Sequence, residues 1–192
     1  MTTGAPAAGW GWPQAGAELH ELCRELVPEA STPITVDVKP AKGAAPKDCF
    51  PNVDGVLARD GGRRELGWKL VENLPGVLLE AEFHAIWVDD AGRRRDVTPS
   101  ELPGVSRILF LPAPGETYEG RQVDNRRVAL VDDDLVRQHI RLQKRLFRFL
   151  NNGRRGAEHG EIRLKGYQAI VASEADRVEQ QVIEKYLPTR SD

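Results

Sequence analysis

The 192-residue sequence contains only two cysteines, Cys23 and Cys49, so it has room for one disulfide at most, and a chain of this size does not need one. No apolar run approaches the roughly 20 residues needed to span a bilayer, and the first residues lack the basic stretch and apolar block of a secretory signal. The 27 Lys and Arg nearly balance the 29 Asp and Glu, which excludes a strong overall field. We therefore expect a cytoplasmic protein with reduced thiols and without membrane contact.

Length and composition predict one domain. With 40% apolar and 29% charged residues, the chain can bury one core but not two large ones. Residues 1–16 are rich in Ala, Gly and Pro and show no periodicity, which is typical of a flexible arm. Trp10 and Trp12 lie in this arm, and aromatic surface is costly to leave in water, so we expect the arm to dock on its own domain or on a partner. Residues 17–192 form the single predicted domain.

Periodicity and turn residues predict helices and strands in alternation. Helical spacing, cap residues and glycine stops predict helices at 17–27, from about Cys49 to the Gly61-Gly62 pair, at 132–150 and, with a serine cap, at 173–187. Alternating or β-branched runs predict strands at 34–38, 66–71, 77–88, 93–97 and 107–111. The short turns between these strands favour hairpins. We expect an α+β fold with a central antiparallel sheet, a helix that carries Cys49 and C-terminal helices packed over the sheet.

Three side chains along this chain have the chemistry of a thiol enzyme. Cys49 falls at or just before a helix start, where the partial positive charge and unpaired N–H groups favour a thiolate. His84 lies in the longest predicted strand, and Asp96 lies near the end of the next strand. Because neighbouring strands are about 4.8 Å apart, the two side chains can meet. A thiol needs a base to take its proton, and the base works best when a third group orients it.

The stretch from Cys49 to Pro99 resembles the transglutaminase-like branch of the papain-like thiol fold. The similarity lies in a cysteine at a helix start, the phrase His84-Ala85-Ile86-Trp87, a turn with Gly92, and Asp96-Val97-Thr98-Pro99. It covers roughly a quarter of the chain. Thr98 and Pro99 come in the order opposite to the usual one after the aspartate, and Phe-Pro follows Cys49 where that group commonly shows a small residue or an aromatic.

The resemblance implies an activity and a role for each residue. Cys49 would be the nucleophile that forms a thioester, His84 the general base and acid, and Asp96 the group that orients the imidazole. We therefore expect a cysteine-dependent amide hydrolase or acyl transferase that acts on a small molecule or peptide and needs no cofactor. Glu82, Trp68 and Trp87 are candidates for substrate binding or for support of the three, although core packing is the commoner role of buried tryptophans.

Two other kinds of function remain open at this stage. A non-catalytic interaction module of the same fold would use the Trp10-Trp12 arm or the basic face of helix 132–150, which comprises Arg137, Arg141, Lys144, Arg145 and Arg148. Such a face is usually solvated and paired with acids, so nucleic-acid binding is not expected. A sheet protein that binds a metal would use Glu80, Glu82 and His84, which alternate onto one face of a strand. That site lacks an obvious second imidazole.

Overall fold

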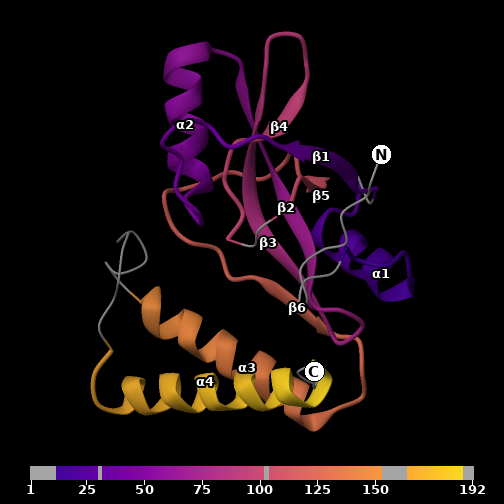
Figure 1. Cartoon of the computed structure of the whole chain (residues 1–192), viewed down its shortest axis with the longest axis vertical. Coiled ribbons are helices and arrows are strands. Elements are labelled where there is room, and N and C mark those ends of the chain that lie inside the picture. Colours follow the sequence, from indigo (N-terminus) through magenta and orange to yellow (C-terminus); the bar gives the residue numbers. More distant parts are fainter. Residues whose placement is uncertain (1–11, 30–31, 102–103, 153–163, 188–192) are drawn as a thin grey trace.

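The structure is a computed structural model, and it describes residues 12–29, 32–101, 104–152 and 164–187. Within these ranges the chain forms an α+β fold of four helices and six strands (Figure 1). The helices are α1 (Ala17–Leu26), α2 (Cys49–Asp60), α3 (Asp134–Leu150) and α4 (Tyr167–Tyr186). The strands are β1 (Ile34–Val38), β2 (Arg63–Leu74), β3 (Leu78–Val88), β4 (Arg94–Asp96), β5 (Arg107–Pro112) and β6 (Arg126–Ala129).

Five of the strands close into a barrel. Their order is β2-β5-β1-β4-β3, and β3 pairs back with β2. The prediction of an antiparallel sheet is wrong for one pair, because β1 and β4 run parallel. The chain passes through α2 and the β2–β3 hairpin between these two strands, and a connection of that length returns a strand in the same direction. The sheet is thus mixed, and β6, which the sequence reading missed, pairs with β3 outside the barrel.

The inside of the barrel is apolar at one end. Val36, Ile86, Ile108 and Phe110 from β1, β3 and β5 form one buried cluster. Each side chain of this size contributes roughly 1.5–3 kcal/mol on burial. On β3 the residues that share the face of Ile86 are His84 and Glu82, since side chains alternate along a strand. The interior therefore changes from apolar to polar along β3.

Gly67 lies in β2, between β3 and β5. It pairs with Pro112 on one side and with His84 on the other. A Cβ at this position would lie 2.3 Å from the Leu111 carbonyl oxygen and 2.5 Å from a ring carbon of Phe110. Only a residue without a side chain leaves room for the Phe110 ring inside the barrel.

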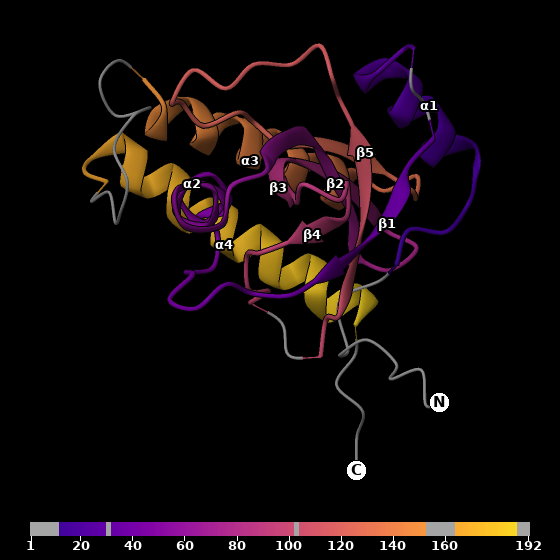
Figure 2. The same ribbon diagram turned by 90° about the horizontal axis from the view of Figure 1, so that it is seen from above.

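Helices α1 and α2 both pack on the outside of the barrel, at separate places along the β2–β3 hairpin (Figures 1 and 2). Leu22 and Cys23 of α1 pack into a cluster with Trp68 and Phe83, on the outward face of β2 and β3. Val53 of α2 belongs to a second cluster, with Cys49, Val56, Ala85, Trp87 and Val97. This packing fixes α2, and with it Cys49, on β3.

Helices α3 and α4 pack against each other beneath the barrel (Figure 1). Val136, Val178 and Val182 form a buried cluster with Leu74 and Leu78 at the turn of the β2–β3 hairpin. The C-terminal helices were expected to pack over the sheet. They do so only at the turn of the β2–β3 hairpin.

The last helix starts earlier than predicted. It begins at Tyr167 after Gly166, whose φ of 56° lies in the left-handed region, and not at Ser173. The buried stripe of α4 already includes Val171 and continues through Ala175 at helical spacing, so the preceding turn is stabilised by packing that a serine-cap signal does not report. The loop expected at 154–160 lies outside the described residues.

The described end of the N-terminal arm is attached to the domain. The backbone N–H of Gln14 donates to Glu72 Oε1 at 2.9 Å, and Pro13 is buried. Trp12 is partly buried, whereas Trp10 lies outside the described residues. Among the helices of the described ranges, none combines the length and apolarity that a bilayer crossing requires.

Candidate active site

Cys49 is the first residue of α2, and a strained turn brings the chain to it. Lys47 has φ 64°, the left-handed region that non-glycine residues seldom adopt, and Asp48 is the cap. Pro51 is tolerated because the first N–H groups of a helix have no intrahelical acceptor. The thiol, 6% exposed, thus lies at the positive end of the helix dipole, and the first turn of α2 carries no acidic residue.

His84 and Asp96 meet across β3 and β4. Trp87 of β3 pairs with Arg95 of β4, so Asp96 lies next to Ile86 and one diagonal step from His84. His84 Nε2 is 3.1 Å from Asp96 Oδ2, in the geometry of an ion pair rather than of a well-aligned hydrogen bond. Both side chains are buried, at 2% and 3% exposure.

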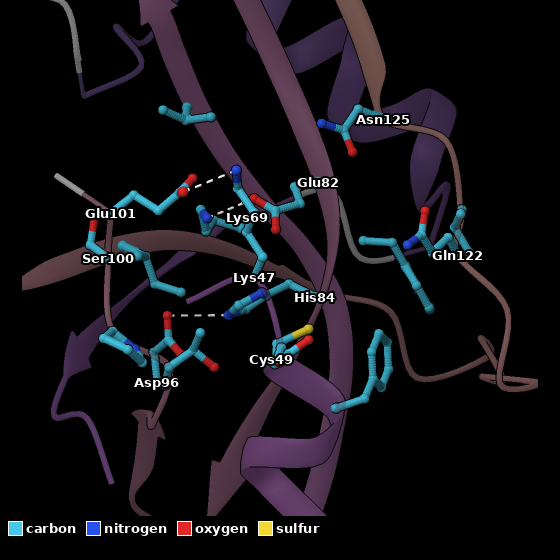
Figure 3. Close-up of a pocket in the computed structure, with 18 of the residues that line it drawn as sticks. Lys47, Cys49, Lys69, Glu82, His84, Asp96, Ser100, Glu101, Gln122 and Asn125 are labelled. Atoms are coloured by element: carbon cyan, nitrogen blue, oxygen red, sulfur yellow. Dashed lines mark hydrogen bonds and ion pairs between the residues drawn. The ribbon is translucent and has the colours of Figure 1, made fainter. Parts of the chain in front are cut away.

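Cys49 and Asp96 lie on opposite sides of the His84 imidazole (Figure 3). Since Nε2 faces the carboxylate, Nδ1 is the ring nitrogen left to exchange a proton with the thiol. The backbone N–H of Thr98 donates to Asp96 Oδ1 at 2.9 Å, which fixes the carboxylate. The structure therefore brings the three side chains together in the order thiol, imidazole, carboxylate.

The charges of this cluster support one another. Burial alone would lower the pKa of His84, but the charges of Asp96 and Cys49, followed by polar contacts with both side chains, raise it to about 10. Burial would raise the pKa of Asp96, and the imidazolium together with the Thr98 N–H holds it below its usual range. The arrangement favours a charged imidazole paired with the Asp96 carboxylate and next to Cys49.

A second ion pair lies beside the three residues. Lys69 Nζ is 2.6 Å from Glu82 Oε2, and the two residues are direct neighbours on β2 and β3. Burial opposes the charge of each, yet their mutual attraction raises the pKa of Lys69 and lowers that of Glu82. Weaker contributions from Asp96 and Cys49 also raise the pKa of Lys69. Lys69 is thus a permanent cation near the thiol.

These side chains line a cleft of about 750 Å³ that opens at the polar end of the barrel. The Phe50 and Tyr118 rings stack with their centroids 3.4 Å apart and form an aromatic wall next to Cys49. Burial and the nearby Cys49 charge raise the pKa of Tyr118. The segment 122–125 forms another wall (Figure 3). The cleft is large enough for a small-molecule or short-peptide substrate.

Neither tryptophan proposed for substrate binding reaches this cleft. Trp68 packs in the cluster under α1, and Trp87 packs in the cluster of α2, where its indole N–H donates to the Gly61 carbonyl at 2.9 Å. The described lining of the cleft does include Glu82. Cys23 is a free, buried thiol of α1 whose pKa is raised by burial.

The residues of the metal-site alternative each have another partner. Glu80 forms an ion pair with Arg127 at 2.7 Å, and Glu82 and His84 are paired as described above. No group of three or more His, Cys, Asp or Glu side chains in the described ranges is arranged to hold a metal ion.

The basic face of α3 is partly occupied by contacts within the protein. Arg137 forms ion pairs with Asp132 and Asp134, and Arg145 contacts the Tyr167 hydroxyl.

The sequence reading missed Asn52, Thr98, Lys69 and Tyr118 as members of the site. Asn52 lies one helical turn after Cys49, a spacing that the sequence shows. The placement of Lys69 opposite Glu82 follows from the hairpin turn near Pro75, once the register is known. Nothing in the sequence indicates that Tyr118, in an irregular segment, reaches Phe50.

Comparison with known proteins found no matching family model, no matching curated protein and no matching solved structure.

Proposed function

We propose that the protein is a cysteine-dependent amide hydrolase or acyl transferase that works through a thioester. The observation that carries this proposal is the Cys49 thiol at a helix start beside an imidazole whose Nε2 lies 3.1 Å from the Asp96 carboxylate, in a cleft. This is the arrangement that activates a thiol as a nucleophile. The resemblance of the segment 49–99 to the transglutaminase-like thiol enzymes supports the proposal.

The chemistry follows from the positions of the atoms. The Cys49 sulfur attacks the carbonyl carbon of an amide, and the carbonyl π electrons move to the oxygen. As that oxyanion collapses, the C–N bond breaks and protonated His84 gives its proton to the leaving amine. The product of this half-reaction is a thioester.

The second half-reaction restores the enzyme. Neutral His84 takes a proton from water or from an amine, whose oxygen or nitrogen attacks the thioester carbonyl. The C–S bond then breaks and Cys49 leaves as a thiolate beside the imidazolium. Water gives a carboxylic acid, and an amine gives a new amide. Asp96 stabilises the imidazolium in both half-reactions.

One donor for the oxyanion comes from the helix itself. The backbone N–H of Cys49 is among the first of α2, which have no intrahelical acceptor. An oxyanion donor of this kind typically contributes about 3 kcal/mol to lowering the barrier. The Lys69 ammonium adds positive potential at the same end of the cleft.

Alkylation by iodoacetamide tests the proposal without a known substrate. At pH 6.5 only about 1% of an ordinary thiol, with a pKa of about 8.5, is ionised. We expect one modification per folded chain at this pH, which peptide mass mapping places at Cys49. Cys23 is the internal control and should react only after unfolding. Slow reaction of Cys49, at the rate of a free cysteine or below it, would favour the non-catalytic interaction module.

An activated ester extends the test to the acyl intermediate. Incubation with p-nitrophenyl acetate should give a protein carrying one acetyl group on Cys49, seen by intact mass, and the Cys49→Ser variant should not turn the ester over at the enzymatic rate. Added glycinamide then separates the two outcomes, because a transferase passes the acetyl group to the amine and a hydrolase to water.

A further inference from the structure

Asn52 joins three segments that meet at the nucleophile. It follows Cys49 by one turn of α2, and its backbone N–H closes the first turn by donating to the Asp48 carbonyl at 2.9 Å. Its side chain pairs with the backbone of Ala45, accepting from the N–H at 3.0 Å and donating to the carbonyl at 2.7 Å. The loop that leads to Cys49 is thereby attached to the helix that Cys49 begins.

The same amide reaches the aspartate segment. Asn52 Nδ2 donates to the Thr98 hydroxyl at 3.2 Å, and the Thr98 backbone N–H donates to Asp96 Oδ1 at 2.9 Å. Thr98 is buried. A continuous chain of contacts therefore runs from the nucleophile helix through Asn52, Thr98 and Asp96 to His84.

The loop is also attached to the aspartate segment by its backbone. The Lys39 N–H donates to the Asp96 carbonyl at 2.8 Å, and the Ala41 N–H donates to the Val97 carbonyl at 2.9 Å. Asn52 thus completes a ring of hydrogen bonds around the loop, α2 and the segment after β4. Without the contact between Asn52 and Thr98, α2 and β4 would be linked mainly by apolar packing, which is less directional.

We propose that Asn52 and Thr98 form a positioning clamp that sets the separation of the Cys49 thiol and the His84–Asp96 pair. This inference rests on the proposed function, since it concerns the alignment of that site. Neither residue is assigned a proton or a bond to substrate. An error of about 1 Å in the placement of a reacting group can cost on the order of 100-fold in rate, so a clamp of two hydrogen bonds has a measurable effect.

The Thr98→Val variant removes the link with the least disturbance. It keeps the shape of the side chain, the Asp96–Thr98 backbone hydrogen bond and the pairing of Asn52 with Ala45. We expect the second-order rate of Cys49 alkylation by iodoacetamide at pH 6.5 to fall roughly 5- to 30-fold. Thr98→Ser keeps the hydroxyl and should restore most of the rate. Thr35→Val, an exposed threonine of β1, is the matched control and should leave the rate unchanged.

Asn52→Ala serves as the second variant and completes a double-mutant cycle. If the two residues act as one clamp, the double variant should be no slower than the slower single variant. A purely structural role would lower the melting temperature of the variants and leave the alkylation rate and its pH profile as in the wild type, and that result would overturn the clamp.

The wild-type control separates this proposal from the function. A reactive wild-type Cys49 with unaffected variants removes the clamp and leaves the proposed function standing. A wild-type Cys49 that reacts as an ordinary thiol removes the proposed function, and the clamp as a catalytic positioning device with it.

Discussion

Two buried histidines, His84 and His139, have pKa values that their surroundings shift in opposite directions. His84 lies between Asp96 and Cys49, whose charges raise its pKa to about 10 although burial opposes the charge. His139 of α3 lies near Arg127, and burial together with that cation lowers its pKa. Both histidines are buried and both lie near an ion pair of β3.

The difference shows how the two buried polar clusters diverge, and why only the cluster of His84 is proposed to be reactive. Around His139 the nearby cation Arg127 is shared by two carboxylates, Glu80 and Asp124, and no cysteine is among the described residues that line the pocket beside it. Even so, burial outweighs Arg127 and raises the pKa of Glu80. Around His84 the Cys49 thiol at the start of α2 lies next to the ion pair. Burial and an ion pair are therefore common to both clusters, and only the thiol and the sign of the neighbouring charge distinguish them.

The largest expected effect comes from replacing each histidine by glutamine. His84→Gln should slow Cys49 alkylation at pH 6.5 by about 100-fold, because an unassisted thiol is then mostly protonated. His139→Gln should leave the rate unchanged, whatever it does to stability. Rates are measured with iodoacetamide and mass spectrometry on samples shown to be folded by circular dichroism. Equal alkylation rates in the two variants would show that His84 does not assist Cys49.

Asp96→Asn removes the ion pair with His84, so it should lower the free energy of unfolding as well as the rate of Cys49 alkylation. The pKa of Asp96 is lowered, so its contribution is present above about pH 4 and is lost as the pH falls. The pKa of His84 is raised, so its contribution is complete below about pH 6.5 and is lost as the pH rises toward about 10. The loss in free energy of unfolding should thus peak between about pH 4 and 6.5, at roughly 3 kcal/mol.

Urea unfolding of wild type and Asp96→Asn across this pH range measures the difference. Arg127→Met, which breaks the ion pair near His139, should also destabilise the protein. A difference between Asp96→Asn and wild type that stays constant from pH 4 to pH 10 would contradict the assigned charges.

Lys69→Met should give the smallest of these effects. Removing the cation leaves Glu82 unopposed near the thiolate, so alkylation of Cys49 at pH 6.5 should slow about 3-fold, and Glu82→Gln should change the rate in the opposite direction. Arg94→Met breaks the ion pair with Glu65, which lies away from the cleft lining, and is the matched control. Equal responses to Lys69→Met and Arg94→Met would show that Lys69 does not act on the thiol.

Local signals predicted most elements of the fold, and long-range pairing explains what they missed. The helix start at Cys49 and the β2–β3 hairpin follow from Pro51, the Gly61-Gly62 pair and the alternation along β3, all of which act over a few residues. The parallel β1–β4 pair joins residues 58 positions apart, and the β2–β5 pairing of the closed barrel joins residues 39 to 45 positions apart, separations that no local pattern encodes. β6 is short and half-buried, so its alternation is weak.

The candidate site divides in the same way. His84 and Asp96 were predicted to meet because a single turn separates their strands. The sequence did not predict the places of Asn52, Thr98 and Tyr118. The Asn52–Thr98 and Phe50–Tyr118 contacts that bring them to the site join residues at least 46 positions apart. Trp68 and Trp87 were predicted to bind substrate from their residue type alone. Their side chains pack against α1 and α2 and not into the cleft.

Gly67 ties the position of β5 to that of His84, because it pairs with His84 of β3 on one side and with Pro112 of β5 on the other. A methyl group at position 67 would overlap both the Leu111 carbonyl and the Phe110 ring, and would press β5 away from β2. A smaller residue in place of Phe110 would relieve only the second overlap, because the first is with the backbone. We therefore expect position 67 to admit glycine alone.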